Sequence, residues 1–173
     1  TTGGIDHIDV GGGINAVIAG AAGDDVSVAA GTSGFDTAVV FGDSGEAVFD
    51  NGVLVRAFTV ASGVGDADQI AILSDNNTVV GGADGDVISV AGGFNRVLGD
   101  EGELQLPVGE PHVIASLNET TGGEDTILAT GGFNVVVGGF ANDRIVGVPG
   151  VTDSANDPSL VVIGDNGRLT FTA

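Results

Sequence analysis

The stretch that decides the fold reads DQIAILSDNNTVVGGADGDVISVAGGFNRVLGD and covers residues 68–100. In it, Asp68, Asn77, Asp86 and Asn95 follow one another at intervals of nine residues. An Ile or Val stands two positions after each of them, usually with a polar residue between. Such alternation is typical of a strand with one buried face, and the glycines ahead of each Asp or Asn favour a tight turn. The repeating unit is therefore a short strand and a turn in nine residues.

The same unit recurs on both sides of this stretch, at Asp6, Asn15 and Asp24 and again at Asp125, Asn134 and Asp143. The aliphatic residues two positions further on are Ile8, Val17, Val26, Ile70, Val79, Ile88, Val97, Ile127, Val136 and Ile145. Asp and Asn turns alternate, so one coil of a spring-like chain would take eighteen residues. Asp turns would then stack along one edge and Asn turns along the other.

A longer period lies above this one, because Asp6, Asp68 and Asp125 are 62 and 57 residues apart. Each superrepeat also carries a GDxG element, at 42–45, 99–102 and 164–167. In register, GDxG opens a third coil whose key position is apolar, namely Ala47, Leu104 and Leu169. We therefore expect an all-β parallel solenoid of about nine coils in one domain, 1–173. Its superrepeats would cover approximately 1–61, 62–119 and 120–173.

Insertions are expected wherever the spacing exceeds eighteen residues. They fall near 29–34, after each GDxG, and at 147–158, where two prolines indicate an exposed loop. The stretch 46–60 contains Asp50-Asn51-Gly52 between two alternating strands, which predicts a hairpin. Residues 103–117 are its counterpart. The third counterpart stops at Ala173 without a second strand, so we expect the ends to meet neighbouring repeats of a longer chain or of another copy.

Composition excludes several classes of function. The 173 residues carry four Arg, no Lys and 24 acids, for a net charge of −20, so no basic surface is available for nucleic acid. There is no Cys for disulfides or a thiolate zinc site, and no apolar run long enough to insert into a membrane. No secretory signal is recognisable, and with no Met in the chain we expect it to be processed or part of a longer protein.

Two rows of uncharged side chains are expected to stack from coil to coil. The amides of Asn15, Asn77, Asn95 and Asn134 would satisfy backbone groups in the turns and bond to one another as a ladder. Phe35, Phe94 and Phe133 precede turn positions in the same way and would form a stacked row. Both rows are interpreted as structural.

The Asp turns raise an electrostatic problem. Carboxylates about 5 Å apart in adjacent coils would repel by roughly 3 kcal/mol at an effective dielectric of 20. A bridging cation, a raised pKa or side chains turned into water would relieve this repulsion, and oxygen ligands favour Ca²⁺. The candidate ligands are Asp6, Asp24, Asp68, Asp86, Asp125 and Asp143, with Asp43, Asp66, Asp84, Asp100 and Asp165 as further candidates. The alternative is that the Asp side chains cap N–H groups of the turns.

The nine-residue unit resembles the repeats-in-toxin (hemolysin-type) calcium-binding repeat, GGxGxDxUx, where U is a large aliphatic residue. The best matches are 19–27, 81–89 and 138–146. The resemblance implies a right-handed parallel β-roll, or β-helix, with Ca²⁺ between successive turns. Sites are expected between Asp6 and Asp24, Asp68 and Asp86, and Asp125 and Asp143. The fourth-position glycine is replaced by Ala22, Asp84 and Ala141, and the Asn edge lacks the carboxylate, so calcium is expected on one edge.

The units also resemble, more loosely, the arrays of very large bacterial surface proteins. The resemblance implies a structural segment of an extracellular or cell-surface fibre, adhesin or matrix protein, which stacks end to end and could contact surface polysaccharide. The alternative is a secreted module whose folding is switched by calcium. A polysaccharide-cleaving enzyme is disfavoured, because the acids follow the repeat and neither His7 nor His112 sits in a catalytic motif.

Overall fold

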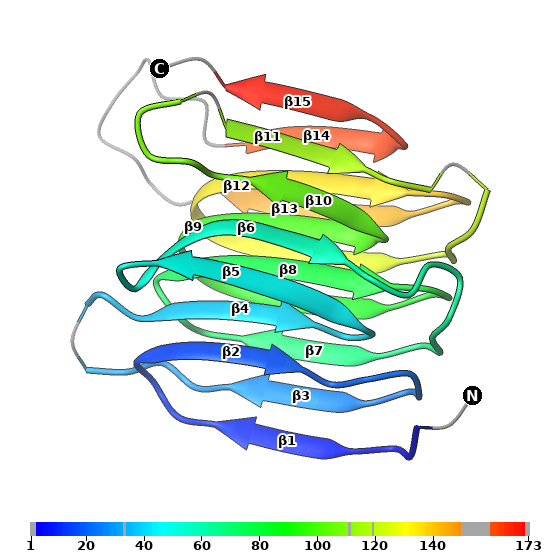
Figure 1. Cartoon of the computed structure of the whole chain (residues 1–173), viewed down its shortest axis with the longest axis horizontal. Helices are drawn as coiled ribbons and strands as arrows, with labels where there is room; N and C mark the ends of the chain where they lie inside the picture. The colour runs from blue at the N-terminus through cyan, green and yellow to red at the C-terminus, as the bar shows by residue number, and fades with distance from the viewer. Residues whose placement is uncertain (1–2, 33, 111, 119, 150–159, 172–173) are drawn as a thin grey trace.

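The computed structural model describes residues 3–32, 34–110, 112–118, 120–149 and 160–171. Within these residues the chain is all-β and contains no helix, and hence none with the length and apolarity to cross a membrane. The strands are β1 (His7–Val10), β2 (Ile14–Ile18), β3 (Asp25–Val28), β4 (Thr37–Phe41), β5 (Gly45–Asp50), β6 (Val53–Thr59), β7 (Gln69–Ile72), β8 (Asn76–Gly82), β9 (Val87–Asp100), β10 (Gly102–Gln105), β11 (His112–Ser116), β12 (Thr126–Gly139), β13 (Arg144–Pro149), β14 (Leu160–Asp165) and β15 (Arg168–Phe171). Figure 1 shows them stacked along one axis.

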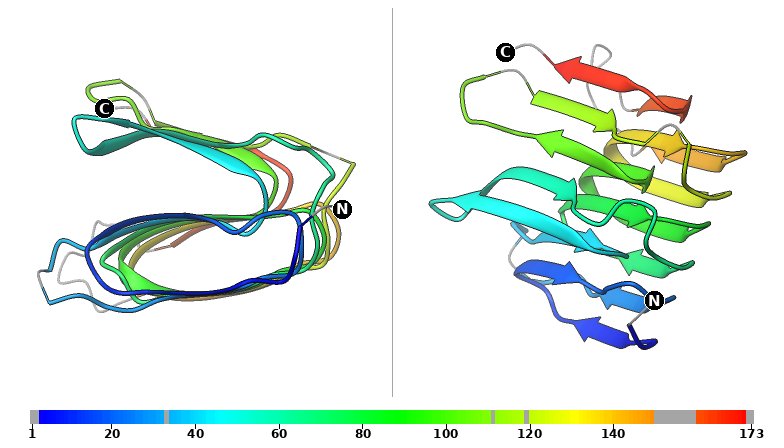
Figure 2. Two further views of the ribbon diagram at one scale, coloured as in Figure 1. Left: turned by 60° about the horizontal axis from the view of Figure 1, so that its bottom comes forward. Right: turned by 45° about the vertical axis from the view of Figure 1, so that its right-hand side comes forward.

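Two parallel layers come from the nine-residue units. The first layer consists of β1, β3, β7, the first part of β9, the first part of β12, and β13. The second layer consists of β2, β4, β8, the second part of β9, the second part of β12, and β14. Strands β9 and β12 run from one layer into the other and so nearly close the parallel sheet. Figure 2 shows the layers as a flattened ring seen along the stack.

The eighteen-residue register is confirmed within each superrepeat. Ile8 pairs with Val26, Ile70 with Ile88, and Ile127 with Ile145. All ten Ile and Val residues of the repeat belong to or pack against one core between the two layers. Small β-branched side chains suit a space this narrow, because they pack well on a pleated surface.

A separate antiparallel sheet, the outer sheet, lies over the second layer in the order β15-β11-β10-β6-β5. Strands β5 and β6 form the predicted hairpin, with Asn51 and Gly52 at φ 49° and 81° in its turn. Strands β10 and β11 form its counterpart. A second core fills the space between the second layer and the outer sheet, and its buried members include Val39, Phe41, Val80, Leu98, Leu104 and Ile114.

The expected third parallel coil of each superrepeat is wrong, and with it the count of nine coils. Ala47 pairs with Ala57, Leu104 with both Ala57 and Ile114, and Leu169 with Ile114, all in the outer sheet. The chain therefore leaves the parallel stack after each GDxG, and after the first two it returns to the stack as β7 and β12. As a result Asp24 lies beside Asp68, 44 residues away, rather than beside Ala47. Apolar residues occupy these positions because they face the second core.

Candidate functional site

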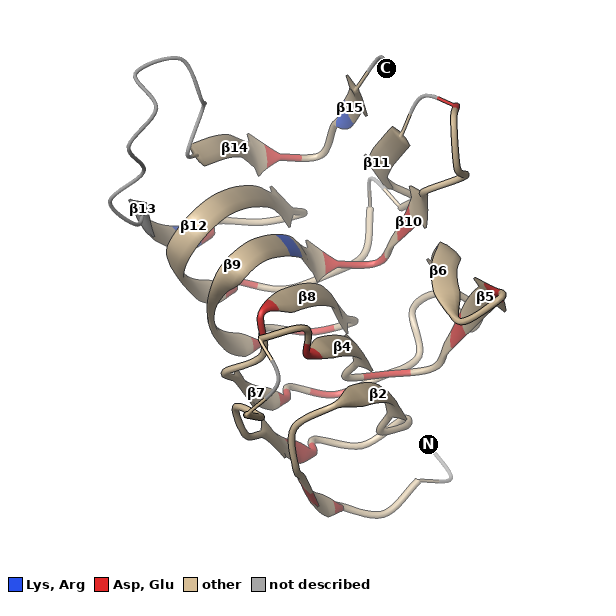
Figure 3. Cartoon of the chain, turned by 90° about the vertical axis from the view of Figure 1, so that its left-hand side faces the viewer, with Lys and Arg blue, Asp and Glu red and all other residues tan. Residues whose placement is uncertain are grey.

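The Asp row comprises Asp6, Asp24, Asp68, Asp86, Asp125 and Asp143, each at the turn that leads into a first-layer strand. The structure brings all six together as one continuous row across the superrepeats. One carboxylate oxygen, Oδ1, of each of the last five accepts a hydrogen bond from the backbone N–H of the preceding member. The donor–acceptor distances run from 2.6 Å, for Asp24 N–H to Asp68, to 3.1 Å, for Asp125 N–H to Asp143. Figure 3 shows acidic residues recurring at the turns of successive coils.

The second carboxylate oxygen, Oδ2, is buried without a hydrogen-bond partner in Asp24, Asp68, Asp86, Asp125 and Asp143. In Asp86 it lies against the Cα of Gly81, where an added Cβ would stand 2.1 Å from Oδ2 and 2.0 Å from the carbonyl oxygen of Gly99. The same arrangement recurs at Gly42, Gly99 and Gly138. A glycine is required at these positions, because any side chain would overlap the carboxyl group.

Burial raises the pKa of several of these carboxyls. The pKa is raised to about 10 for Asp86, to about 8 for Asp125 and to about 7 for Asp68, with desolvation as the largest cause. The backbone N–H bonds oppose the rise, and neighbouring carboxylates add to it. The pKa of Asp143 is raised for the same reason. A proton on such a carboxyl group removes its charge, and with it the repulsion between neighbouring members of the row.

Two further buried acids, Asp43 and Asp100, come from GDxG elements, and each joins two neighbouring turns by hydrogen bonds. Asp43 accepts the N–H of Ala83 at 2.6 Å and that of Asp66, and Asp100 accepts the N–H of Gly123 at 2.9 Å and that of Phe140. Asp66 and Gly123 lie where the chain re-enters the parallel stack, and Ala83 and Phe140 lie in the next turn along it. Desolvation raises the pKa of both Asp43 and Asp100 to about 7.

Asp165 is the third residue of this kind, and we call Asp43, Asp100 and Asp165 the corner Asp residues. Unlike the other two, Asp165 is exposed, at the end of β14. It therefore occupies the corner position of the third superrepeat on the outermost described coil, beyond which the structure describes no further coil. Asp66 and Asp84, the remaining candidate ligands, are exposed at the turns.

Sequence reasoning missed Glu101, which is 2 % exposed. Its carboxylate accepts hydrogen bonds from the Ser62 hydroxyl, the Gly63 N–H, the Asn118 amide and the Thr121 hydroxyl. It thereby ties together two successive return loops, one before β7 and one before β12. The variable position of GDxG gave no signal for this role, since Ser44 and Asn166 occupy it in the other copies.

The Asn ladder is confirmed for three of its four members. The Asn77 amide donates to Asn95 Oδ1 at 2.7 Å, and the Asn95 amide donates to Asn134 Oδ1 at 2.6 Å. Asn15 does not join, because Ala38 lies between it and Asn77; its amide donates to the Gly11 carbonyl instead. The Phe row is similarly shorter than expected. Phe94 and Phe133 stack with centroids 4.9 Å apart, but Thr37 and not Phe35 holds the equivalent place two coils earlier.

In this arrangement one oxygen of each of the last five carboxylates of the Asp row accepts an N–H, and the other has no hydrogen-bond partner. Ca²⁺ takes six to eight oxygen ligands, whereas Oδ1 of each buried Asp already accepts an N–H. No group of three or more His, Cys, Asp or Glu side chains among the described residues could hold a metal ion. The predicted sites between Asp6 and Asp24, Asp68 and Asp86, and Asp125 and Asp143 stay predictions from the resemblance.

A scan against models of known protein families found no match for the chain, and searches of curated proteins and of solved structures found none either.

Proposed function

We propose that this chain is a structural repeat module: a stiff, acidic segment of a β-solenoid whose superrepeats stack end to end. The support comes from the junctions between superrepeats, which are built in the same way each time. At both internal junctions a corner Asp accepts two backbone N–H groups of the following superrepeat. A bond within the Asp row also crosses each junction, from Asp24 N–H to Asp68 and from Asp86 N–H to Asp125.

The observation that carries the proposal is that the outermost coils present the two halves of the same junction. Asp165 corresponds to Asp43 and Asp100. By the 62-residue period, Gly4 and Ala21 correspond to Asp66 and Ala83, whose N–H groups the corner Asp43 binds. Asp6 likewise corresponds to Asp68, so the Asp6 carboxylate of one copy would accept the N–H of Asp143 of the copy stacked before it. Another superrepeat of this kind would therefore complete the bonds that the internal junctions make.

The experiment is sedimentation velocity of the 173-residue chain over a range of concentrations in 1 M NaCl, where the Debye length is about 3 Å and the charge of −20 is largely screened. We expect concentration-dependent association, weakened several-fold by Asp165→Ala. Glu110→Ala is the matched control: it removes an exposed carboxylate from the loop between β10 and β11, which are inner strands of the outer sheet. A chain that stays monomeric at every concentration, or an Asp165→Ala variant that associates as the parent does, would contradict the proposal.

The extracellular or cell-surface setting and the calcium-switched alternative rest on the sequence resemblance. Circular dichroism with a chelator and with excess CaCl₂ separates the two functions. A structural module keeps its β signal in chelator, because the described hydrogen bonds hold the Asp row without an ion. A calcium-switched module loses that signal in chelator and regains it when CaCl₂ is added.

A further inference from the structure

A groove of about 490 Å³ lies between the second layer and the outer sheet. Its floor comes from β2, β4, β8 and β9, and its roof comes from the β5–β6 hairpin and the β10–β11 loop. The volume falls within the range of small-molecule sites, which is about 300 to 1,000 Å³. The structural role proposed above does not use this groove.

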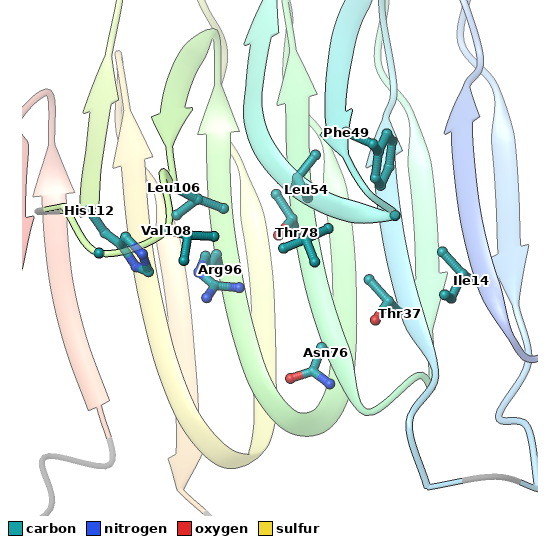
Figure 4. A pocket seen from close by; sticks show the side chains of 13 residues that line it. Ile14, Thr37, Phe49, Leu54, Asn76, Thr78, Arg96, Leu106, Val108 and His112 are labelled. Carbon is teal, nitrogen blue, oxygen red and sulfur yellow. The ribbon is translucent and has the colours of Figure 1, made fainter.

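The lining combines apolar side chains with the guanidinium of Arg96 and the imidazole of His112. The apolar surface comes from Ile14, Phe49, Val53, Leu54, Leu106 and Val108. Ile14 is 68 % exposed and Val108 is 79 % exposed, so this surface lacks cover at its mouth. Figure 4 shows Arg96, Val108 and His112 gathered toward one end, with Phe49 and Ile14 toward the other. The groove is therefore cationic at one end and apolar at the other.

The charge of the groove is opposite to that of the molecule. The chain carries 24 acids and four Arg, yet none of the described residues that line the groove is acidic. Within the described part of the chain, Arg96 makes no ion pair with a carboxylate; its guanidinium lies 4.1 Å above the ring of Phe94 instead. Arg56 shows the contrast, since it stacks on Phe58 at 4.0 Å and also bonds to Glu103 at 2.6 Å.

Arg96 keeps its charge at neutral pH. Burial lowers the pKa of its guanidinium to about 10, which still leaves it protonated. A half-buried cation without an anionic partner is unfavourable, and an anion that displaces its remaining water would gain a charge-assisted, bidentate contact. The stack on Phe94 fixes the plane of the guanidinium and leaves its edge for such a contact.

We propose that this groove binds a small organic anion with an apolar body, its carboxylate at Arg96 and its chain directed toward Ile14 and Phe49. The floor crosses four coils, from β2 to β9, which at the strand spacing is about 14 Å. An extended acyl chain of medium length fits such a path. The groove is lined by side chains of two facing sheets rather than by a free strand edge, so it favours this ligand over an added peptide strand.

The test is isothermal titration calorimetry with decanoate, and with decanol as the neutral probe of similar length. We expect saturable binding of decanoate at one per chain and at least about tenfold weaker binding of decanol, since a charged hydrogen bond contributes about 1.5–3 kcal/mol. Non-saturable uptake of decanoate, or equal affinity for both probes, would overturn the proposal.

Arg96→Gln should weaken decanoate binding about tenfold or more, while the matched control Arg56→Gln should leave it within about twofold. Val108→Glu is a second variant that does not disturb the core, because Val108 is 79 % exposed. Its carboxylate would compete with the ligand for Arg96, and it should weaken binding of decanoate but not of decanol. Unchanged decanoate affinity in both Arg96→Gln and Val108→Glu would refute the site.

Discussion

At the scale of single residues, the backbone at two turns adopts a conformation that suits glycine. Asp84 and Ala141 have φ of 61° and 80°, in the left-handed region. They occupy the fourth position of the nine-residue unit, where the consensus that the chain resembles has glycine. A side chain with a Cβ is strained there, whereas glycine adopts this φ freely.

Ala141→Gly should therefore stabilise the protein. Relief of the strained φ contributes about 1–2 kcal/mol of stability. The extra entropy that glycine gives the unfolded chain costs less, about 0.4–1 kcal/mol. The measurement is the free energy of unfolding in urea. Ala22→Gly is the control, since Ala22 holds the same turn position without a positive φ, and it should be neutral or destabilising. A loss of stability in Ala141→Gly would show that the turn is not strained.

The Asn ladder has a gap at Ala38, and the gap leaves a buried acceptor unsatisfied. Asn77 Oδ1 has no hydrogen-bond partner, although Asn95 and Asn134 each receive an amide N–H at the same place. Ala38→Asn would place an amide between Asn15 and Asn77 in the established register.

We expect Ala38→Asn to raise the unfolding free energy by about 1 kcal/mol, because it supplies a hydrogen bond to a buried acceptor. Ala16→Asn serves as the control, since Ala16 is exposed on the neighbouring strand and should give no gain. A clear loss of stability in Ala38→Asn would mean that this coil has no room for the amide.

At the scale of the element, the Asp row couples stability to pH. The folded pKa of Asp68, Asp125 and Asp86 is raised to about 7, about 8 and about 10, from 3.8 in the unfolded chain. The folded state therefore binds protons more tightly than the unfolded state. The contribution to stability is complete below about pH 4 and is lost as pH rises through 7 to 10.

We therefore expect the melting temperature to fall between pH 5 and pH 9.5 at constant high salt. Asp86→Asn replaces the most strongly shifted carboxyl with a neutral group of similar shape, so it should reduce this fall and raise stability at pH 9.5. Glu46→Gln is the control, because Glu46 is exposed on β5 and its neutralisation should leave the pH dependence unchanged. A melting temperature that rises with pH would refute the protonated row.

The parallel strands and the first core could be predicted from the sequence, because one physical rule generates them. In each repeat unit, the Ile or Val two positions after the key Asp or Asn packs between the two layers. The hairpin at 46–60 was equally readable, because Asn51-Gly52 adopts positive φ with little strain. The direction of the Asp side chains was not, since capping and ion binding use the same residue at the same spacing.

At the scale of the whole molecule, the sequence predicted the hairpin at 46–60 and its counterpart but not that their strands join into a separate outer sheet. Its strands alternate in hydrophobicity much as the parallel strands do, so period alone could not assign them to a different sheet. The informative signal was chemical: Leu104 and Leu169 stand where the Asp row would require a carboxylate, because they face a second core. The described residues 160–165 continue the second layer as β14, while 150–159, including most of the predicted 147–158 loop, lie outside the described part.

Both sheets pair strands that precede the β10–β11 loop with strands that follow it, so a cut in this loop would leave the two pieces joined by strand pairing. A break after Gly109, in the loop between β10 and β11, would separate residues that remain joined by the β9–β12 and β10–β11 ladders. Each fragment alone would leave part of the second core uncovered, because Leu104 in one fragment pairs with Ile114 in the other. We therefore expect the fragments 1–109 and 110–173 to reassemble when they are mixed. The mixture should then give the circular dichroism spectrum of the intact chain.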